Sequence, residues 1–232
     1  MKQLTQDEIK KRVGQKAASL VEEGMLVGLG TGSTASCFID SLIERCREGL
    51  KITAVSSSQR SLQQARAGGI HTMDFNQFAT LDLTVDGTDE IDPQNRMIKG
   101  GGGALVREKI LATSSRQVVV IADEGKLVSV LGKCPLPVEI IPFGIRATLA
   151  KIQAMGYQGN MRTNPDGTFY VTDNGNYILD IFSPGGFAKP EEDHERLIHQ
   201  PGVVDTGFFF NLPLRLLVGR KDGTVSFQED TI

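Results

Sequence analysis

The sequence predicts an α/β protein with a doubly wound, mostly parallel sheet of the Rossmann-like type and a smaller α+β second domain. Three observations support this fold class. Residues 1–125 alternate short apolar runs with segments of helical periodicity, as in parallel sheets that are covered by helices. After about residue 131, prolines surround the apolar runs and turn signals join the runs in pairs. With 232 residues, the chain is long enough for two small domains.

Caps and apolar periodicity define the elements of the first half. Thr5 and Glu8 form a capping-box pattern before a helix that Gly24 closes. A glycine turn at residues 30–33 leads into a second helix, which runs to about residue 47. The remaining runs predict strands at residues 25–29, 52–55, 81–85 and 118–122 and helices at residues 62–67 and 105–113.

The second half is expected to combine antiparallel strands with two helices. Asn174-Gly175 is a strong hairpin signal and lies between apolar runs at residues 169–172 and 177–182. Asp222-Gly223 predicts a last hairpin. The other expected elements are strands at residues 138–141, 207–210 and 214–218 and helices at residues 146–155 and 191–199.

The composition excludes several classes of protein. The formal net charge of −3 and the lack of a Lys/Arg stripe argue against a nucleic-acid partner. The longest continuous apolar run, residues 118–122, is far shorter than the roughly 20 residues of a membrane span. Cys37, Cys46 and Cys134 are odd in number and irregularly spaced, which fits neither a disulfide framework nor a zinc signature. We therefore expect a cytoplasmic protein with no membrane partner.

The first loop that can carry chemistry is GLGTGSTA, residues 28–35. It is not a dinucleotide fingerprint, because Ser33 stands at the third glycine position and no acid follows the second strand. Backbone amides at the start of the next helix, with the hydroxyls of Thr31, Ser33 and Thr34, offer a phosphate site. The alternative is a tight turn in which Ser33 is only the N-cap of the helix.

A second loop, VDGTDEID at residues 85–92, places two carboxylates at the end of a strand. Asp86 follows the apolar run directly and Asp89 comes three residues later, so a turn can aim both at one point. Two carboxylates suit the hydroxyls of a polyol, or a divalent metal. The alternative is that Asp and Gly simply make a good turn.

A third loop, KGGGGALVRE at residues 99–108, puts four glycines after a lysine. Such a run is kept where the backbone must be approached closely or φ must be positive, unless the loop is merely flexible. Lys99 supplies a cation. Glu108 lies about one turn into the next helix and can point back toward the loop, where it would serve as a base. The alternative for Glu108 is an ordinary exposed helix residue.

Together the three loops favour a sugar phosphate as ligand. In a parallel sheet, ligands bind beyond the carboxyl ends of the strands, and the first two loops lie at such ends. Clustered carboxylates would repel a phosphate beside them, so we expect them to bind hydroxyls at the opposite end of the ligand.

The motifs GLGTGSTA, SSS, VDGTDEID, KGGGGALVREK, IADEGK, PLPVEIIP and VTDNGNYILD occur in an order and spacing that resemble ribose-5-phosphate isomerase of the A type. The resemblance covers the chain from Thr5 to about Gly223. It implies interconversion of ribose 5-phosphate and ribulose 5-phosphate in the pentose phosphate pathway through a cis-enediol(ate). It also implies that neither a metal nor an organic cofactor is needed, and that the protein is a homodimer or homotetramer.

The resemblance also assigns roles to individual residues. Glu108 matches the catalytic base, Asp86 and Asp89 the acids that bind sugar hydroxyls and assist ring opening, and Lys99 the cation that stabilises the enediolate oxygen. The substrate-binding positions are Thr31, Gly32, Ser33, Thr34, Asp86, Gly87, Thr88, Asp89, Lys99, Gly100, Gly101, Gly102 and Lys126.

Two departures from the family pattern remove no functional group. Thr88 stands where Ala is common, and Gly103 extends the usual three glycines to four. The family fold further implies that residues 1–131 and 206–232 form the catalytic domain and that residues 132–205 form the smaller one.

Three other functions remain open on the sequence. A sugar-phosphate-sensing regulator would bind without turnover and would need a DNA-binding module, for which about 24 residues before the first strand are too few. An acyl-CoA transferase would use Glu108 as a nucleophile. A catalytically dead homologue is disfavoured, because Asp86, Asp89, Lys99 and Glu108 are all present.

Overall fold

The computed structural model describes residues 3–228, which form two compact units. The first unit comprises the described residues up to Thr88, Arg107–Leu127 and those from Leu212 onwards. The second comprises Asp89–Val106 and Val128–Asn211. That residues 132–205 fold as a separate, smaller domain stays a prediction. The bounds of the two compact units differ from the predicted domain bounds mainly at residues 89–106, which carry Asp89, Lys99 and the four glycines.

The first unit contains the predicted doubly wound sheet. Its six strands follow the order β13-β12-β6-β3-β1-β2, and all neighbours are parallel except β12 and β13. The strands are β1 (Leu26–Leu29), β2 (Thr53–Ser56), β3 (Leu81–Gly87), β6 (Ser115–Asp123), β12 (Leu214–Gly219) and β13 (Val225–Phe227). The antiparallel pair confirms the last predicted hairpin, whose turn is closed by Gly223 N–H donating to Arg220 O at 2.9 Å.

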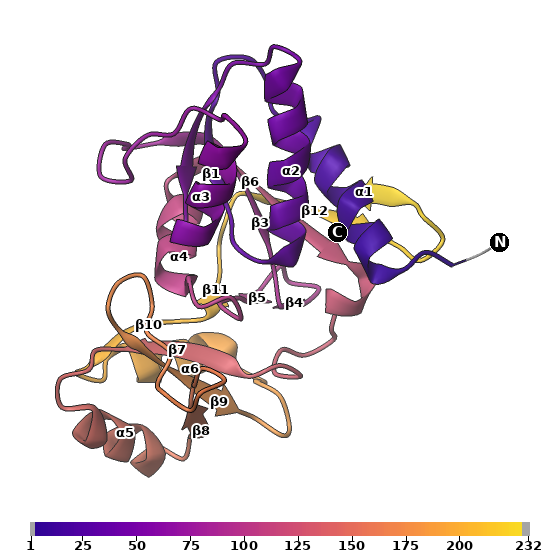
Figure 1. The fold of residues 1–232 in the computed structure, drawn as a ribbon. Coiled ribbons are helices and arrows are strands. Elements are labelled where there is room, and N and C mark those ends of the chain that lie inside the picture. The colour runs from indigo at the N-terminus through magenta and orange to yellow at the C-terminus, as the bar shows by residue number, and fades with distance from the viewer. Residues whose placement is uncertain (1–2, 229–232) are drawn as a thin grey trace. The chain divides into compact units, whose positions relative to one another are not determined.

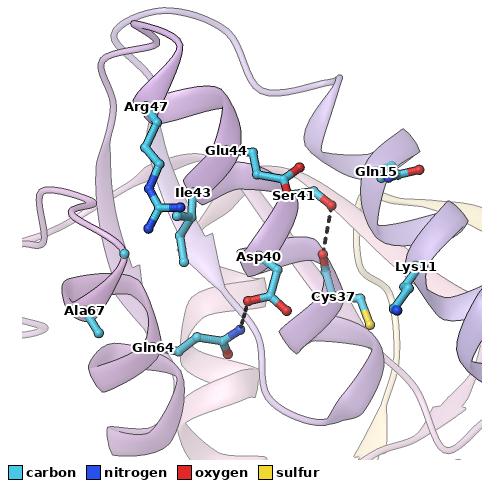
Figure 2. Close-up of a pocket in the computed structure, with 11 residues that line it drawn as sticks. Lys11, Gln15, Cys37, Asp40, Ser41, Ile43, Glu44, Arg47, Gln64 and Ala67 are labelled. Carbon is cyan, nitrogen blue, oxygen red and sulfur yellow. Dashed lines mark hydrogen bonds between the residues drawn. The ribbon is translucent and has the colours of Figure 1, made fainter.

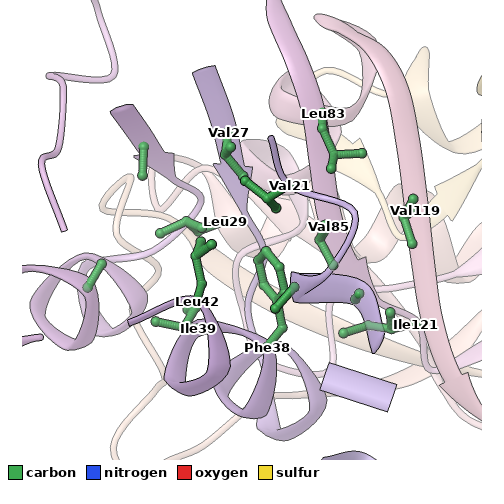
Figure 3. Close-up of a cluster of buried hydrophobic side chains, with 14 of the residues drawn as sticks. Val21, Val27, Leu29, Phe38, Ile39, Leu42, Leu83, Val85, Val119 and Ile121 are labelled. Atoms are coloured by element: carbon green, nitrogen blue, oxygen red, sulfur yellow. The ribbon is translucent and has the colours of Figure 1, made fainter. Parts of the chain in front are cut away.

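Four helices accompany this sheet. They are α1 (Gln6–Ala18), α2 (Ser33–Arg47), α3 (Gln59–Ala67) and α4 (Leu105–Thr113). The capping box at Thr5 and Glu8 is confirmed. In Figure 1, α2 lies between α1 and α3, and the three helices are in contact in that order. Figure 3 shows Phe38 of α2 among the strand residues Val27, Leu29, Val85 and Ile121, all of which are buried.

A second apolar cluster packs α4 against the sheet. Leu111 of α4 packs with Val55 of β2 and Leu81 of β3, whereas Ala54, the neighbour of Val55, belongs to the cluster around Phe38. Successive side chains of a strand point to opposite faces, so the two clusters cover the two faces of the sheet. This explains why the middle of β6, residues 118–122, reads as a continuous apolar run.

The second unit has the predicted α+β character. A four-stranded antiparallel sheet has the order β10-β7-β9-β8, and a three-stranded one the order β11-β5-β4. The first sheet consists of β7 (Leu136–Ile140), β8 (Gln158–Met161), β9 (Tyr177–Phe182) and β10 (Val203–Thr206). The second consists of β4 (Glu90–Ile91), β5 (Met97–Ile98) and β11 (Phe208–Phe209). Two helices, α5 (Ile145–Ala154) and α6 (Pro190–Ile198), complete the unit.

One strand of the second unit was predicted wrongly. Residues 169–172 form no strand, although Asn174-Gly175 makes the expected turn, with Gly175 at a φ of 79°. The reason is that both edges of β9 are occupied, one by β7 and the other by β8. The short polar strand β8, Gln-Gly-Asn-Met, gave no apolar signal and was missed.

Among residues 3–228, no helix combines the length and the apolar character that crossing a membrane requires.

Candidate active site

The carboxyl edge of the first unit's sheet collects several predicted residues. Strands β1, β2, β3 and β6 are parallel, so their carboxyl ends meet at one edge. Residues 30–34 follow β1, Asp86 ends β3, and the short 3-10 helix Glu124–Lys126 follows β6. Because α4 leads back into the start of β6, its own first turn, which contains Glu108, begins at this same edge.

The loop after β1 presents the start of a long helix. Helix α2 begins at Ser33, and its N-cap is Gly32, with a φ of 110° and no capping side chain. The alternative in which Ser33 is the N-cap is therefore wrong. Gly32 and Ser33 are exposed, and Thr31 and Thr34 beside them are half-buried. The first turn of α2 thus has no side-chain cap on its amides, which is the arrangement that suits a phosphate.

Serines after β2 hold this loop in place. Thr31 Oγ1 and Ser57 Oγ share a hydrogen bond of 2.7 Å, and Ser61 Oγ donates to Gly30 O at 2.8 Å. Ser57 is fully buried. The three consecutive serines were the only sequence signal of this support, and they did not reveal which loop the hydroxyls contact.

Asp86 is fixed by the same loop. Its carboxylate is 4% exposed and accepts the N–H of Thr31 at 3.0 Å and that of Gly87 at 2.7 Å, both at Oδ1. Gly30 provides the space, since a Cβ there would lie 2.0 Å from Asp86 Oδ1 and 2.6 Å from Asp86 Cα. The glycine at this point is thus required by packing.

Gly30→Ala should therefore lower the free energy of unfolding by about 1–3 kcal/mol, because backbone as well as carboxylate must move to admit one methyl group. Gly185→Ala is the matched control, since a Cβ at Gly185 meets nothing within 4 Å and its φ is ordinary. Thermal unfolding of both variants checks the expectation. Equal melting temperatures for the two would contradict it.

The second unit brings Asp89, Lys99 and the glycine loop together. Gly101 N–H donates to Asp89 Oδ2 at 2.7 Å. Lys99 is 4% exposed, its N–H donates to Gly207 O at 2.8 Å, and its Nζ lies 5.4 Å from the centre of the Phe209 ring. A buried lysine in contact with an aromatic face is held in one place, as a catalytic cation must be.

Glycine is required at the fourth position of the loop, Gly103, by the backbone conformation and by a neighbouring side chain. Gly103 has a φ of 80°, and a Cβ there would lie 2.3 Å from the hydroxyl oxygen of Tyr170. Gly103 N–H also closes the turn by donating to Gly100 O at 2.9 Å. The loop is thus an ordered turn packed against Tyr170, and the alternative of a merely flexible loop is wrong.

The predicted residues consequently fall into two sets. Glu108 and Asp86 belong to the first unit, and Glu108 is 3% exposed, so the alternative of an exposed helix residue is wrong. The first set further includes Thr31, Gly32, Ser33, Thr34, Gly87, Thr88 and Lys126; the second set is Asp89, Lys99, Gly100, Gly101 and Gly102. Among residues 3–228, no group of three His, Cys, Asp or Glu side chains is arranged to hold a metal ion.

A cavity of about 610 Å³ lies elsewhere in the first unit, among α1, α2 and α3 (Figure 2). None of the predicted site residues lines it. Gln64 donates to Asp40 across it at 2.8 Å, and Lys11 and Glu44 face it from α1 and α2. Burial, and secondarily Asp40, raises the pKa of the Cys37 thiol, so this thiol is protonated at neutral pH. A protonated thiol is a poor nucleophile.

Comparison with known proteins gives one consistent result. The family model of ribose 5-phosphate isomerase A (phosphoriboisomerase A) matches residues 53–223. Ribose-5-phosphate isomerase A of Protochlamydia amoebophila is 50% identical over 214 residues, which is 92% of either chain. The protein of that name in Chlamydia felis is 52% identical over 202 residues, 87% of either chain.

Solved structures agree with the sequence comparisons. Ribose 5-phosphate isomerase A from Methanocaldococcus jannaschii is 35% identical, with a TM-score of 0.90 over 97% of this chain and 100% of that one. A D-ribose-5-phosphate isomerase in complex with phospho-erythronic acid is 33% identical, with a TM-score of 0.91 over the same shares. The chain belongs to the ribose 5-phosphate isomerase A family.

Proposed function

We propose that this chain interconverts D-ribose 5-phosphate and D-ribulose 5-phosphate, an aldose–ketose isomerisation of the non-oxidative pentose phosphate pathway, through a cis-enediol(ate) intermediate. The observation that carries the proposal is the family match over residues 53–223 in a chain that keeps Asp86, Asp89, Lys99 and Glu108. The structure of one relative contains phospho-erythronic acid, the phosphate ester of a sugar acid, and this supports a phosphorylated polyhydroxy ligand.

The phosphate is proposed to bind at the start of α2. Amides of Gly32, Ser33 and Thr34 and the hydroxyls of Thr31, Ser33 and Thr34 supply donors, and the N-terminal end of a helix favours negative charge. Lys126 follows β6 at the same edge of the sheet and adds a positive charge. Binding the phosphate here orients the sugar for the reaction at its other end.

Asp86 and Asp89 are proposed to bind the sugar hydroxyls and to assist ring opening. Each carboxylate is held by backbone N–H groups, Asp86 by Thr31 and Gly87 and Asp89 by Gly101, so its orientation is fixed. Fixed acceptors are what the recognition of a polyol requires, because each hydroxyl is a directional donor.

Glu108 is proposed to move the proton between C2 and C1. It takes the C2 proton of the open-chain aldose, and the electrons pass into the C1–O1 carbonyl to form the enediolate. A proton then passes from O2 to O1, and the electrons of the C1=C2 bond take up the proton from Glu108 at C1, which leaves the C2=O2 carbonyl of the ketose. Lys99, together with an amide of the glycine loop, stabilises the negative oxygen of the intermediate. Glu108 is buried in the first turn of α4, so one carboxylate in a fixed position can serve both transfers.

The family resemblance supports two further proposals: the reaction needs no metal ion and no organic cofactor, and the protein assembles as a homodimer or homotetramer. The three cysteines, which fit no disulfide framework, support a third, that the protein works in the cytoplasm.

Isomerisation of ribose 5-phosphate by the purified protein in EDTA tests the proposed function. We expect ribulose 5-phosphate to form at the same rate with and without chelator, and ribose without its phosphate to react far more slowly. Phospho-erythronic acid should inhibit competitively. Saturable binding of ribose 5-phosphate with no product would favour the sensor. A rate lost in EDTA and restored by a divalent cation would overturn the metal-free mechanism.

A further inference from the structure

Arg162 contacts the glycine loop from the side opposite to Asp89. It follows β8, and its Nη1 donates to the carbonyl oxygens of Gly100 at 2.9 Å and Gly101 at 3.2 Å. The rest of the guanidinium is held by Asp180 of β9, with Nε donating to Oδ2 at 2.9 Å and Nη2 to Oδ1 at 2.5 Å. Both side chains are largely buried, with 17% and 18% exposed. Such a bidentate pair fixes the orientation of the guanidinium plane.

The two contacts of Arg162 also fix the directions in which N–H groups of the loop point. In a trans peptide the C=O and the following N–H point in opposite directions, and none of the described peptide bonds is cis. Because Gly100 O faces Arg162, Gly101 N–H faces away, and it donates to Asp89 Oδ2 at 2.7 Å. Because Gly101 O faces Arg162, Gly102 N–H is turned away from Arg162 as well.

The two N–H groups have different tasks available to them. Gly101 N–H orients Asp89. Gly102 is exposed, and its N–H donates to no other residue within the part of the chain that the structure describes. It is therefore available to an oxyanion. Glycines lose more backbone freedom on ordering than other residues, so an external clamp is needed to keep two such peptide planes in one orientation.

We propose that Arg162, anchored by Asp180, is a positioning residue for the isomerisation. Its guanidinium orients the Gly100–Gly101 and Gly101–Gly102 peptides, so that one N–H holds Asp89 for a sugar hydroxyl and the next donates to the enediolate oxygen. Arg162 acts through the loop and does not touch the substrate. This inference rests on the proposed function.

The test compares Arg162→Met with a matched arginine of the same unit. Arg162 lies 6.0 Å from the centre of the Tyr170 ring in addition to its carbonyl contacts. Arg196 donates to Met155 O at 2.8 Å and lies 5.2 Å from the Tyr157 ring, so Arg196→Met loses a carbonyl contact and a ring contact outside the loop. We expect Arg162→Met to lower kcat about 10²-fold, as loss of an oxyanion donor does. Its affinity for inorganic phosphate should match that of the wild type, and Arg196→Met should keep the wild-type kcat.

Chemical rescue separates positioning from mere support of the fold. In Arg162→Ala, which leaves the space of the arginine side chain empty, guanidinium chloride at millimolar concentration should restore part of the lost kcat in a saturable manner. Ammonium chloride should not, since only the planar ion can bridge Asp180 and the two carbonyls. Asp180→Asn should lower kcat in the same direction with a smaller effect.

The outcomes are distinguishable. A wild-type protein that makes no ribulose 5-phosphate would contradict the proposed function. An active wild type with an equally active Arg162→Met would overturn only this inference. A loss of kcat that parallels a fall in the melting temperature, and that guanidinium chloride does not reverse in Arg162→Ala, would also overturn it. If Arg162→Met does not fold, Arg162→Lys decides, because it keeps the charge: a folded Arg162→Lys with the wild-type kcat would overturn the proposal.

Discussion

Glu108→Gln should lower the kcat for ribose 5-phosphate by about 10²–10⁴-fold, which is the contribution of a positioned general base. Glutamine has nearly the same shape but cannot accept the proton from C2. Because Glu108 is buried in the first turn of α4, with 3% exposed, a carboxylate on the protein surface cannot easily take over its role as the base. Steady-state kinetics, with calorimetric binding of phospho-erythronic acid, measures both sides of the expectation: turnover falls and binding persists.

Glu44→Gln is the control for this substitution. Glu44 is an exposed residue of α2 in the same unit, and the same chemical change there should leave the rate as it is. Parallel losses of turnover and binding in Glu108→Gln would make Glu108 a structural residue. A thioester on Glu108 after incubation with an acyl-CoA would instead point to the transferase alternative.

Lys99→Met should lower kcat by about 10²–10³-fold, because the enediolate oxygen loses a fixed cation. Methionine keeps an unbranched apolar chain that can pack against Phe209, the ring beneath Lys99 Nζ, so the fold should be retained. The effect on KM should be small, since the charge on this oxygen develops only as the proton leaves.

Lys133→Met provides the comparison for Lys99→Met. Lys133 is an exposed lysine of the same unit and should tolerate the change with no effect on the rate. If Lys99→Met weakened the binding of ribose 5-phosphate as much as it lowered kcat, Lys99 would belong to ground-state binding. A full rate in Lys99→Met would remove it from the mechanism.

The doubly wound sheet could be predicted because its signals are local. Each strand of the first unit is an apolar run between turn signals, and carboxyl ends of parallel strands share an edge by topology. That rule predicts that the loop after β1 lies beside Asp86, and the hydrogen bond from Thr31 N–H to Asp86 Oδ1 confirms it.

What could not be predicted depends on partners distant in the sequence. Arg162 reaches Gly100 across 62 positions and Ser61 reaches Gly30 across 31, and neither pairing leaves a periodic signal. Residues 169–172 were assigned to a strand because a turn signal cannot tell whether the neighbouring strand edge is already occupied. Asp86 and Asp89 are three residues apart, yet they belong to different compact units.

The most direct test of the account is the fate of the transferred proton. Ribose 5-phosphate is incubated with the protein in D₂O, and deuterium at C1 of ribulose 5-phosphate is followed by NMR for the wild type and Glu108→Gln. We predict that the wild type places deuterium at C1 in part of the product, through exchange at the base, and that Glu108→Gln incorporates it at a rate lower by the same factor as its kcat. Undiminished incorporation of deuterium by Glu108→Gln would contradict proton transfer by Glu108.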